Sequence, residues 1–344
     1  MRKNTSLMKV MLFGTQPYDQ QTFERMRKSY GFEIVYHRSH LNAESALLAK
    51  GADAVCVFVN DTVDAETVQQ LAELGVRLIA LRCAGFNNVD LHAAARCNIP
   101  VVRVPAYSPH AVAEYAVALI LALNRKIHRA YTRTREGNFA LHGLMGFDLY
   151  GKTAGIVGTG KIARPLIHIL KGFGMEVVAY DIAPDERYAL TEEIEYVPLE
   201  ELYRRADIIS LHCPLTDQTR HMIDGTAIER MKEGVMLINT GRGQLIDTAA
   251  LIDGLKQKRI GAAGLDVYEE EAAYFYEDTS DRIMDDDLLA RLLSFNNVIV
   301  TSHQAFFTRE ALDNIVRVTL QNINDFFEQR KLVNQVCIEA EKAV

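Results

Sequence analysis

The 344-residue sequence lacks the features that mark several classes of protein. No apolar run approaches the roughly 18 residues expected of a membrane-spanning helix. The N-terminal stretch MRKNTSLMKVMLFG has too short an apolar segment for a signal peptide. The five cysteines are scattered, without a CxxC pair or metal-ligand spacing, so we expect neither a disulfide framework nor a metal site. These absences predict a cytoplasmic protein with reduced thiols and no membrane partner.

Positive charge is also scarce. The sequence has 38 Lys and Arg against 45 Asp and Glu, giving a formal charge of −7 and a pI of about 5.8. This balance argues against a nucleic-acid partner or an anionic membrane surface, since both require an excess of basic residues. The apolar content of 49% is ordinary for a globular protein, and the length suggests about two domains.

Short apolar runs alternate with helical patterns in two series. The first series predicts strands at Lys9–Phe13, Glu33–Tyr36, Ala54–Val59, Arg77–Arg82 and Val101–Val104, with helices at Gln20–Tyr30, Ala43–Lys50, Ala65–Glu73 and Asp90–Arg96. The second predicts strands at 154–158, 176–181, 208–213, 235–240, 261–267 and 297–303. This alternation is typical of α/β folds built on mostly parallel sheets. A final helix is expected near Arg309–Gln329.

One long apolar helix is predicted between the two series, at Pro109–Arg129. A helix this apolar is buried on more than one side, either between domains or against a second copy of the chain. The polar, glycine-bearing stretch Thr132–Gly151 is interpreted as a connector, and the acidic stretch Tyr276–Asp287 as a solvated excursion.

The strongest motif is GTGKIA, which follows the strand at 154–158 and opens a helix. Gly158, Gly160, Lys161 and Ile162 fit the dinucleotide-binding fingerprint, with Ala163 in place of the third glycine. Asp181 ends the next strand, 21 residues after Gly160 (181 − 160). A carboxylate there accepts hydrogen bonds from the adenosine ribose and repels a 2′-phosphate, so the motif predicts NAD rather than NADP.

Three reactive residues fall at the carboxyl ends of apolar strands of the second series: Arg242, Glu271 and His303. Ligands of open α/β sheets bind at these carboxyl ends. Singly, each has a structural explanation, because a strand-end histidine, an arginine between glycines or a solvated glutamate is common. Together they suit hydride transfer to a 2-keto acid: arginine binds the substrate, histidine donates a proton, and a carboxylate favours the charged imidazole.

The whole set resembles the D-2-hydroxyacid dehydrogenase family, and more narrowly its fermentative, NAD-dependent D-lactate dehydrogenases. The similarity extends over nearly the whole chain, through RCAGFNNVD (82–90), VPAYSPHAVAE (104–114), GIVGTGKI (155–162), LHCPLT (211–216), NTGRG (239–243), GLDVYEEE (264–271) and TSHQAFFT (301–308). The resemblance implies a reversible reduction of pyruvate to D-lactate, with NAD as cofactor and a homodimer or homotetramer as the assembly.

The resemblance also implies roles for individual residues. It makes Arg242 the substrate-binding residue, His303 the proton donor and Glu271 its partner. The remaining expected positions are Ala84, Gly85, Tyr107 and Phe306 at the substrate, and Cys213, Pro214, Thr240, Gly241 and Asp266 near the nicotinamide.

The family architecture consists of two Rossmann-like or flavodoxin-like parallel-sheet domains with a deep cleft. The NAD domain is inserted into a discontinuous substrate domain. On this basis residues 1–102 and 304–344 form the substrate-binding domain, and residues 103–303 form the NAD-binding domain.

Four other functions are weighed against this interpretation. A phosphoglycerate dehydrogenase usually carries a C-terminal regulatory extension, and a formate dehydrogenase has Gln where this sequence has Glu271. A glyoxylate or hydroxypyruvate reductase stays open, because pocket size is difficult to judge from sequence. A non-catalytic NAD-sensing protein would bind NADH without turnover of any keto acid, although all three catalytic positions are present here.

Overall fold

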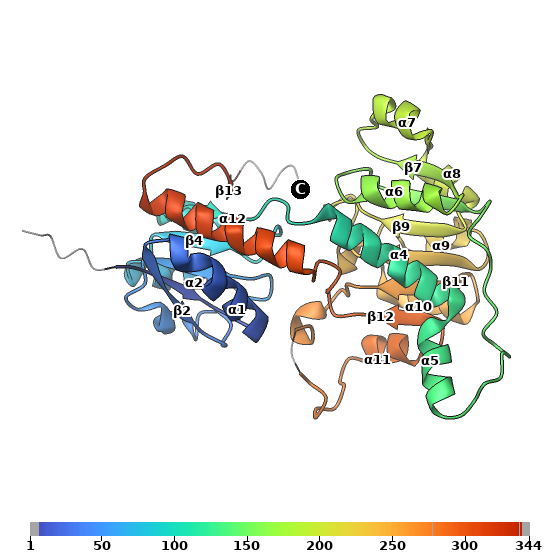
Figure 1. Cartoon of the computed structure of the whole chain (residues 1–344), viewed down its shortest axis with the longest axis horizontal. Helices are drawn as coiled ribbons and strands as arrows, with labels where there is room; N and C mark the ends of the chain where they lie inside the picture. The colour runs from blue at the N-terminus through green and yellow to red at the C-terminus, as the bar shows by residue number, and fades with distance from the viewer. Residues whose placement is uncertain (1–6, 277, 337, 339–344) are drawn as a thin grey trace, which may run out of the picture. The chain divides into compact units, whose positions relative to one another are not determined.

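The computed structural model describes residues 7–276, 278–336 and 338, which form two compact α/β units. The first unit comprises Met1–Ser108 and Phe307–Val344, and the second comprises Pro109–Phe306. Figure 1 shows the first unit in blue to cyan and red, and the second in green to orange. Two segments far apart in the sequence therefore build one unit, and a continuous segment builds the other.

The first unit contains a six-stranded sheet. Its strands are β1 (Met8–Leu12), β2 (Phe32–Tyr36), β3 (Ala54–Val57), β4 (Leu78–Leu81), β5 (Val101–Val102) and β13 (Gln335–Val336). They lie in the order β13-β5-β4-β3-β1-β2, and only the β13–β5 pair is antiparallel. The parallel strands follow the flavodoxin-like order 2-1-3-4-5, whose switch point lies between β1 and β3.

Helices cover both faces of this sheet. They are α1 (Pro17–Met26), α2 (Ala65–Glu73), α3 (Leu91–Arg96) and α12 (Arg309–Phe327), with short 3-10 turns η1 (Arg27–Ser29) and η2 (Ala46–Ala49). One face packs apolar side chains of α1 and α12 against the sheet, and the other packs those of α2 and α3. Because α12 supplies Val316, Leu320 and Ile323 to the first face, the end of the chain completes a core begun at its start.

The second unit contains a seven-stranded, wholly parallel sheet. Its strands are β6 (Thr153–Val157), β7 (Glu176–Tyr180), β8 (Glu195–Tyr196), β9 (Ile208–Leu211), β10 (Val235–Asn239), β11 (Ile260–Leu265) and β12 (Val298–Val300). The order β12-β11-β10-β9-β6-β7-β8 is the Rossmann order 3-2-1-4-5-6 with one further strand. The switch point lies between β6 and β9, where dinucleotides bind in this fold.

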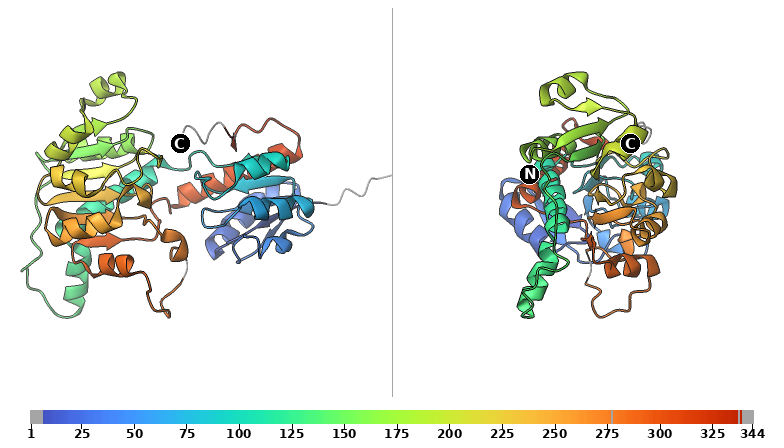
Figure 2. Two further views of the ribbon diagram at one scale, coloured as in Figure 1. Left: turned by 180° about the vertical axis from the view of Figure 1, so that it is seen from behind. Right: turned by 90° about the vertical axis from the view of Figure 1, so that its right-hand side faces the viewer.

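Helices again occupy both faces. They are α4 (Pro109–Arg125), α5 (Ile127–Arg135), α6 (Ala163–Gly172), α7 (Glu186–Glu192), α8 (Leu199–Arg205), α9 (Gly225–Arg230), α10 (Thr248–Lys256) and α11 (Asp287–Ser294), with turns η3 (Gly243–Leu245) and η4 (Glu271–Ala273). α4 and α6 pack on one face, and α8 to α11 pack on the other. Figure 2 shows this sandwich from behind and from one side.

Two sequence expectations for helices were wrong. The helix expected at Pro109–Arg129 ends at Arg125, because Lys126 adopts a left-handed conformation with φ of +51°. A separate helix, α5, then occupies the first part of the expected connector. The helix expected at Ala43–Lys50 is only the short turn η2.

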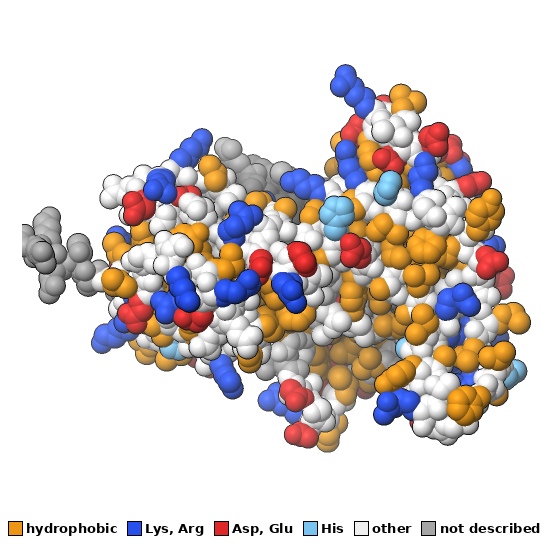
Figure 3. All heavy atoms as spheres, viewed as in Figure 1, with side chains coloured by type: hydrophobic (Ala, Val, Ile, Leu, Met, Phe, Trp, Pro, Cys, Tyr) orange, Lys and Arg blue, Asp and Glu red, His pale blue; other side chains and the backbone are white. Residues whose placement is uncertain are grey.

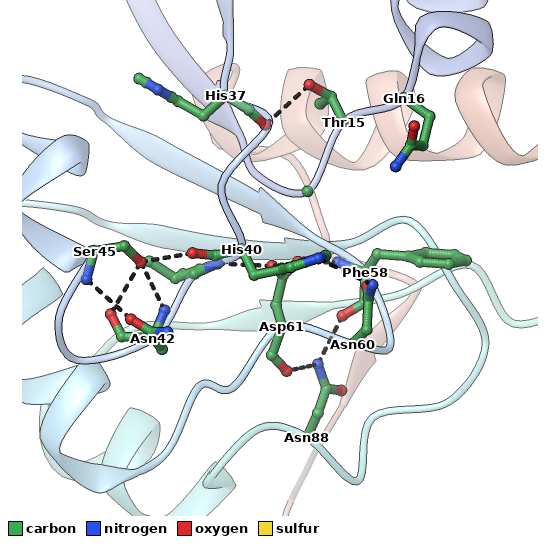
Figure 4. Close-up of polar contacts among 12 residues, drawn as sticks. Thr15, Gln16, His37, His40, Asn42, Ser45, Phe58, Asn60, Asp61 and Asn88 are labelled. Carbon is green, nitrogen blue, oxygen red and sulfur yellow. Dashed lines mark hydrogen bonds and ion pairs between the residues drawn. The ribbon is translucent and has the colours of Figure 1, made fainter. Parts of the chain in front are cut away.

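Buried polar contacts hold the loops that follow β2 and β3 in the first unit (Figure 4). Asp61 is 1% exposed, and its two carboxylate oxygens accept hydrogen bonds from the backbone N–H groups of Leu41 (2.7 Å) and Phe58 (2.6 Å). The Asn88 amide donates to the carbonyl oxygens of Phe58 and Asp61, both at 2.8 Å. One buried carboxylate thus fixes two loops at the carboxyl edge of the sheet.

Among the described residues, we find no helix with both the length and the apolarity needed to cross a membrane.

Candidate active site

The turn after β6 requires glycine at Gly158. Its φ is +88°, and a Cβ atom there would lie 2.7 Å from the backbone nitrogen of Cys213 and 2.8 Å from the carbonyl carbon of His212. Gly160 differs, because a Cβ atom at that position would meet no atom of the described residues within 4 Å. The first glycine therefore allows strand-to-loop packing, and the second keeps space open where the fingerprint places a pyrophosphate.

Asp181 follows β7 and faces this turn. Its Oδ2 accepts hydrogen bonds from the backbone N–H (2.7 Å) and hydroxyl (2.8 Å) of Thr159, and its Oδ1 accepts from the N–H of Ala183 (2.9 Å). Partial burial raises the pKa of Asp181. These hydrogen bonds lower that pKa by more than burial raises it, so it lies below its usual value. The carboxylate is therefore ionised at neutral pH and available to a ribose.

Arg242 lies on a tight loop after β10. The buried Asn239 side chain organises this loop, accepting from the N–H of Gly241 (3.0 Å) and donating to the carbonyl of Arg242 (2.8 Å). Arg242 Nη1 donates to the carbonyl of Gly241 at 2.9 Å. The hydroxyl of Thr240, on the same loop, is buried and has no hydrogen-bond partner among the described residues. An orphaned buried hydroxyl is a ready partner for a bound polar ligand.

Gly243 brings this loop against the segment that follows β11. A Cβ atom on Gly243 would lie 2.1 Å from the carbonyl carbon and oxygen of Tyr268 and 2.5 Å from the nitrogen of Glu269. Only glycine permits this approach of two backbones. The arginine loop and the segment carrying Glu271 are therefore in direct contact.

Glu271 and His303 form a half-buried pair. His303 Nδ1 lies 2.9 Å from Glu271 Oε1, and the side chains are 17% and 24% exposed. Glu271 Oε2 accepts a hydrogen bond from the N–H of Tyr268 at 3.1 Å. Because the carboxylate accepts at Nδ1, the imidazole presents Nε2 for proton exchange.

The backbone of His303 is also constrained. Its φ is +51°, which is uncommon for a non-glycine residue and costs conformational energy. The N–H of His303 donates to the carbonyl of Asp266 at 2.7 Å, and its carbonyl accepts from the Tyr276 hydroxyl at 3.1 Å. Glu271 and Tyr276 lie on one short segment, so that segment holds both the ring and the backbone of the histidine.

Asp266 is fully buried, and its carbonyl accepts the hydrogen bond from the N–H of His303. Its carboxylate accepts hydrogen bonds from the Thr301 hydroxyl (2.6 Å) and the N–H groups of Gln304 (2.9 Å) and Ala305 (2.8 Å). Burial raises the pKa of Asp266 above its usual value, although these hydrogen bonds and the nearby histidine act in the opposite direction. The carboxylate fixes the loop on which His303 lies.

The other expected cofactor residues lie on or near the turn at Gly158. Lys161 is exposed and Ile162 is half-buried at the start of α6. Cys213 lies against Gly158, and burial raises the pKa of its thiol to about 11, so it is not a thiolate nucleophile at neutral pH. Pro214 is exposed, and its carbonyl accepts a hydrogen bond from Thr219 at 2.7 Å.

The expected substrate residues divide between the units. In the first unit, Arg103 donates to the carbonyl of Ala84 at 2.9 Å, the Cys83 thiol approaches the carbonyl of Gly85 at 3.3 Å, and Asn314 donates to the carbonyl of Tyr107 at 2.6 Å. Phe306 belongs to the second unit, where it is 7% exposed.

Several residues that shape the site escaped the sequence interpretation. Thr159 and Thr301 lie inside the motifs GTG and TSH, so their position offered a signal. Gly243 ends the motif GRG, but its contact with Tyr268 links segments distant in sequence. No pattern in the sequence indicates the hydrogen bond from Tyr276 to His303.

These features fit a dinucleotide. The open space at Gly160, the ionised Asp181 and the orphaned Thr240 hydroxyl offer complementary groups along one edge of the sheet. Within the described ranges, no cluster of three or more His, Cys, Asp or Glu side chains is placed to hold a metal ion. The fold and site define a nucleotide-dependent α/β oxidoreductase.

Comparisons with known proteins identify the family. Residues 117–305 match the model of the D-isomer-specific 2-hydroxyacid dehydrogenase NAD-binding domain. A 2-hydroxyacid dehydrogenase homolog of Haemophilus influenzae is 51% identical, covering 92% of this chain and 95% of that protein. The D-lactate dehydrogenase of Escherichia coli is 48% identical, covering 96% of this chain and all of that protein.

A solved structure agrees. The structure described as the pyruvate reductase of Chlamydomonas reinhardtii has a TM-score of 0.90 and 46% identity, covering 95% of this chain and 98% of that one. The chain belongs to the D-isomer-specific 2-hydroxyacid dehydrogenase family. The family and the α/β fold predicted from the sequence are both confirmed.

Proposed function

We propose that the protein is an NAD-dependent D-lactate dehydrogenase that reversibly converts pyruvate to D-lactate. The observation that carries the proposal is the His303–Glu271 pair, held in one unit with the Arg242 loop and the dinucleotide turn. The E. coli relative named D-lactate dehydrogenase and the Chlamydomonas structure named a pyruvate reductase favour this substrate.

Each part of the site then has a role in the reduction. Bound NADH supplies the hydride to the carbonyl carbon of the substrate. Arg242 binds the substrate carboxylate and carbonyl with its fork of N–H donors, which is permanently charged and suited to paired oxygens. His303 delivers a proton from Nε2 to the carbonyl oxygen, which becomes the hydroxyl of lactate, and Glu271 stabilises the charged ring. In the oxidative direction His303 accepts that proton.

The cofactor is assigned to the second unit. Gly158, Gly160, Lys161 and Ile162 form the pyrophosphate turn, and Asp181 accepts hydrogen bonds from the adenosine ribose. The positions near the nicotinamide are Cys213, Pro214, Thr240, Gly241 and Asp266.

The first unit is assigned to substrate binding. The backbone at Cys83, Ala84 and Gly85 holds the carboxylate, and Tyr107 reaches the substrate. From the second unit, Phe306 lines the pocket for the small methyl group.

A homodimer or homotetramer is part of the proposal. Exposed apolar side chains gather on the arm formed by residues 127–150, and Figure 3 shows hydrophobic side chains over this part of the second unit. The most exposed are Ile127, Tyr131, Phe139, Leu141, Met145 and Tyr150, between 57% and 87%. Exposed apolar patches of this kind mark protein interfaces, and a second copy of the chain is the proposed partner. Light scattering on the purified protein tests this assembly.

A cytoplasmic location is proposed because the described cysteines Cys56, Cys97 and Cys213 are reduced thiols, as expected in a reducing compartment.

The test is NADH oxidation with a panel of 2-keto acids, followed by chiral chromatography of the product. We expect rapid turnover of pyruvate to D-lactate, and a loss of about 10²-fold or more in His303→Ala. A preference for glyoxylate or hydroxypyruvate would retain the mechanism but refute the substrate. NADH binding without turnover of any keto acid would refute the enzyme assignment.

A further inference from the structure

A cationic side chain lies beside the turn that reads the adenosine ribose. Arg164 is the second residue of α6, and its Nε donates to the carbonyl of Thr159 at 3.3 Å. The backbone N–H and hydroxyl of the same Thr159 donate to Asp181 at 2.7 and 2.8 Å. One residue of the glycine turn therefore links the guanidinium and the ribose-reading carboxylate.

Arg164 is at present held by other groups. Its Nη2 donates to Asp185 Oδ2 at 2.7 Å, and its guanidinium carbon stacks 4.3 Å above the ring centroid of Tyr188. Asp185 caps α7 on the far side of the loop that begins at Asp181, because its Oδ1 accepts from the N–H of Tyr188 at 3.1 Å. The ion pair therefore draws the arginine toward α7.

The chain thus contains both groups that Rossmann proteins use to distinguish the two cofactors. An acid at the end of the second strand binds the ribose 2′-hydroxyl of NAD, whereas a nearby arginine accommodates the 2′-phosphate of NADP. With Asp185 in place, the local charges are those of Asp181, Asp185 and Arg164, which sum to one negative charge. Neutralising Asp185 brings that sum to zero and leaves the guanidinium without its carboxylate partner.

We propose that the Arg164–Asp185 ion pair is a second determinant of cofactor choice: it withholds Arg164 from a 2′-phosphate, so that Asp181 rejects NADPH unopposed. The inference deepens the proposed function, since it rests on the adenosine ribose binding at Asp181. The pair is partly exposed, with side chains 44% and 39% accessible, so the guanidinium can exchange partners at small cost.

The chain allows a clean substitution. Asp185→Asn removes the charge while keeping a good N-cap for α7, because asparagine caps helices as well as aspartate does. Arg164→Gln removes the cation and retains part of the aliphatic stem that packs on Tyr188. Asp253→Asn is the matched control, since it neutralises the carboxylate of another exposed ion pair, with Lys256 on α10.

Dissociation constants for NADH and NADPH are measured by titrating each cofactor and following its own fluorescence. We expect Asp185→Asn to bind NADPH about 5- to 10-fold more tightly, as one charge-assisted contact at a partly exposed site allows. The NADH constant should change by less than about twofold. The gain should disappear in the Arg164→Gln/Asp185→Asn double variant, shrink with added salt and be absent in Asp253→Asn.

Two outcomes would overturn the proposal. The NADPH affinity of Asp185→Asn could equal that of the unsubstituted protein. Alternatively, the gain in NADPH affinity could persist in the Arg164→Gln/Asp185→Asn double variant. Asp181→Asn separates this failure from failure of the proposed function. If Asp181→Asn changes neither NADH nor NADPH binding, the adenosine ribose does not bind at Asp181, and the assumption beneath the inference is wrong. If Asp181→Asn weakens the preference for NADH over NADPH while Asp185→Asn leaves that preference unchanged, only the role of the ion pair is refuted.

Discussion

Replacing Gly243 with alanine places a methyl group where the backbone after β11 already lies. The new Cβ atom would be 2.1 Å from the carbonyl of Tyr268, against about 3.4 Å for an ordinary contact, so one backbone has to move by about 1.3 Å. The movement separates the arginine loop from the segment carrying Glu271. Displacements of about 1 Å in catalytic groups cost roughly 10²-fold in rate. We therefore expect kcat to fall about 100-fold, with an overpacking cost of about 1–3 kcal/mol in the free energy of unfolding.

Steady-state NADH oxidation with pyruvate measures the rate, and urea unfolding measures the stability. NADH affinity should fall far less than kcat, because the pyrophosphate turn at Gly158 and the carboxylate of Asp181 lie on other loops. Gly225→Ala is the matched control, since within the described part of the chain a Cβ atom there meets nothing closer than 4 Å and Asp224 still caps α9. A folded Gly243→Ala protein with kcat within about threefold of the original would refute the argument.

Three further predictions follow from the described contacts. Arg242→Lys should lower kcat/KM for pyruvate about 10- to 100-fold with NADH affinity retained, because lysine lacks the planar fork; an unchanged kcat/KM would contradict this role. Burial lowers the pKa of His212 to about 4, so below pH 6.5 the unfolded chain binds a proton that the folded chain refuses. As the pH is lowered from 6.5 to 4, the free energy of unfolding should therefore fall by less in His212→Gln than in the unsubstituted protein. Urea titrations at each pH measure this difference. Asn124→Ala should destabilise the protein by about 2 kcal/mol, because Asn124 bonds both backbone groups of Phe147 at 2.7 and 2.8 Å. It should also reduce the fraction of the proposed oligomer in light scattering; an unchanged assembly would separate the arm from oligomerisation.

The sequence predicted the elements whose pattern is local. The apolar runs at Lys9–Phe13 and 235–240 became the central strands β1 and β10, because strands buried on both faces carry few polar residues. β8 and β13 were missed, since each has only two residues and owes its pairing to neighbouring strands. The break at Lys126 was missed as well, because lysine is a good helix former and gives no local stop signal.

The candidate site shows the same division. The placement of Glu271 beside His303 was predicted from strand ends and from family resemblance, and the structure brings the two side chains to 2.9 Å. The left-handed backbone of His303 could not be predicted, because it depends on Asp266 and Tyr276, which lie 37 and 27 positions earlier in the chain (303 − 266 and 303 − 276). Contacts between segments distant in sequence carry no periodic signal.

The division of the first unit between both ends of the chain has a consequence for synthesis on the ribosome. The sheet face formed by Val10 and Leu12 is covered partly by α12, which is made only after the whole of Pro109–Phe306. At about 5–20 residues per second, roughly 10 to 40 s separate the two events. During that interval the nascent first unit exposes apolar surface, whereas the inserted unit has all of its own strands as soon as its own synthesis ends. Translation rate and chaperone access over this window should therefore govern the yield of the first unit far more than that of the second.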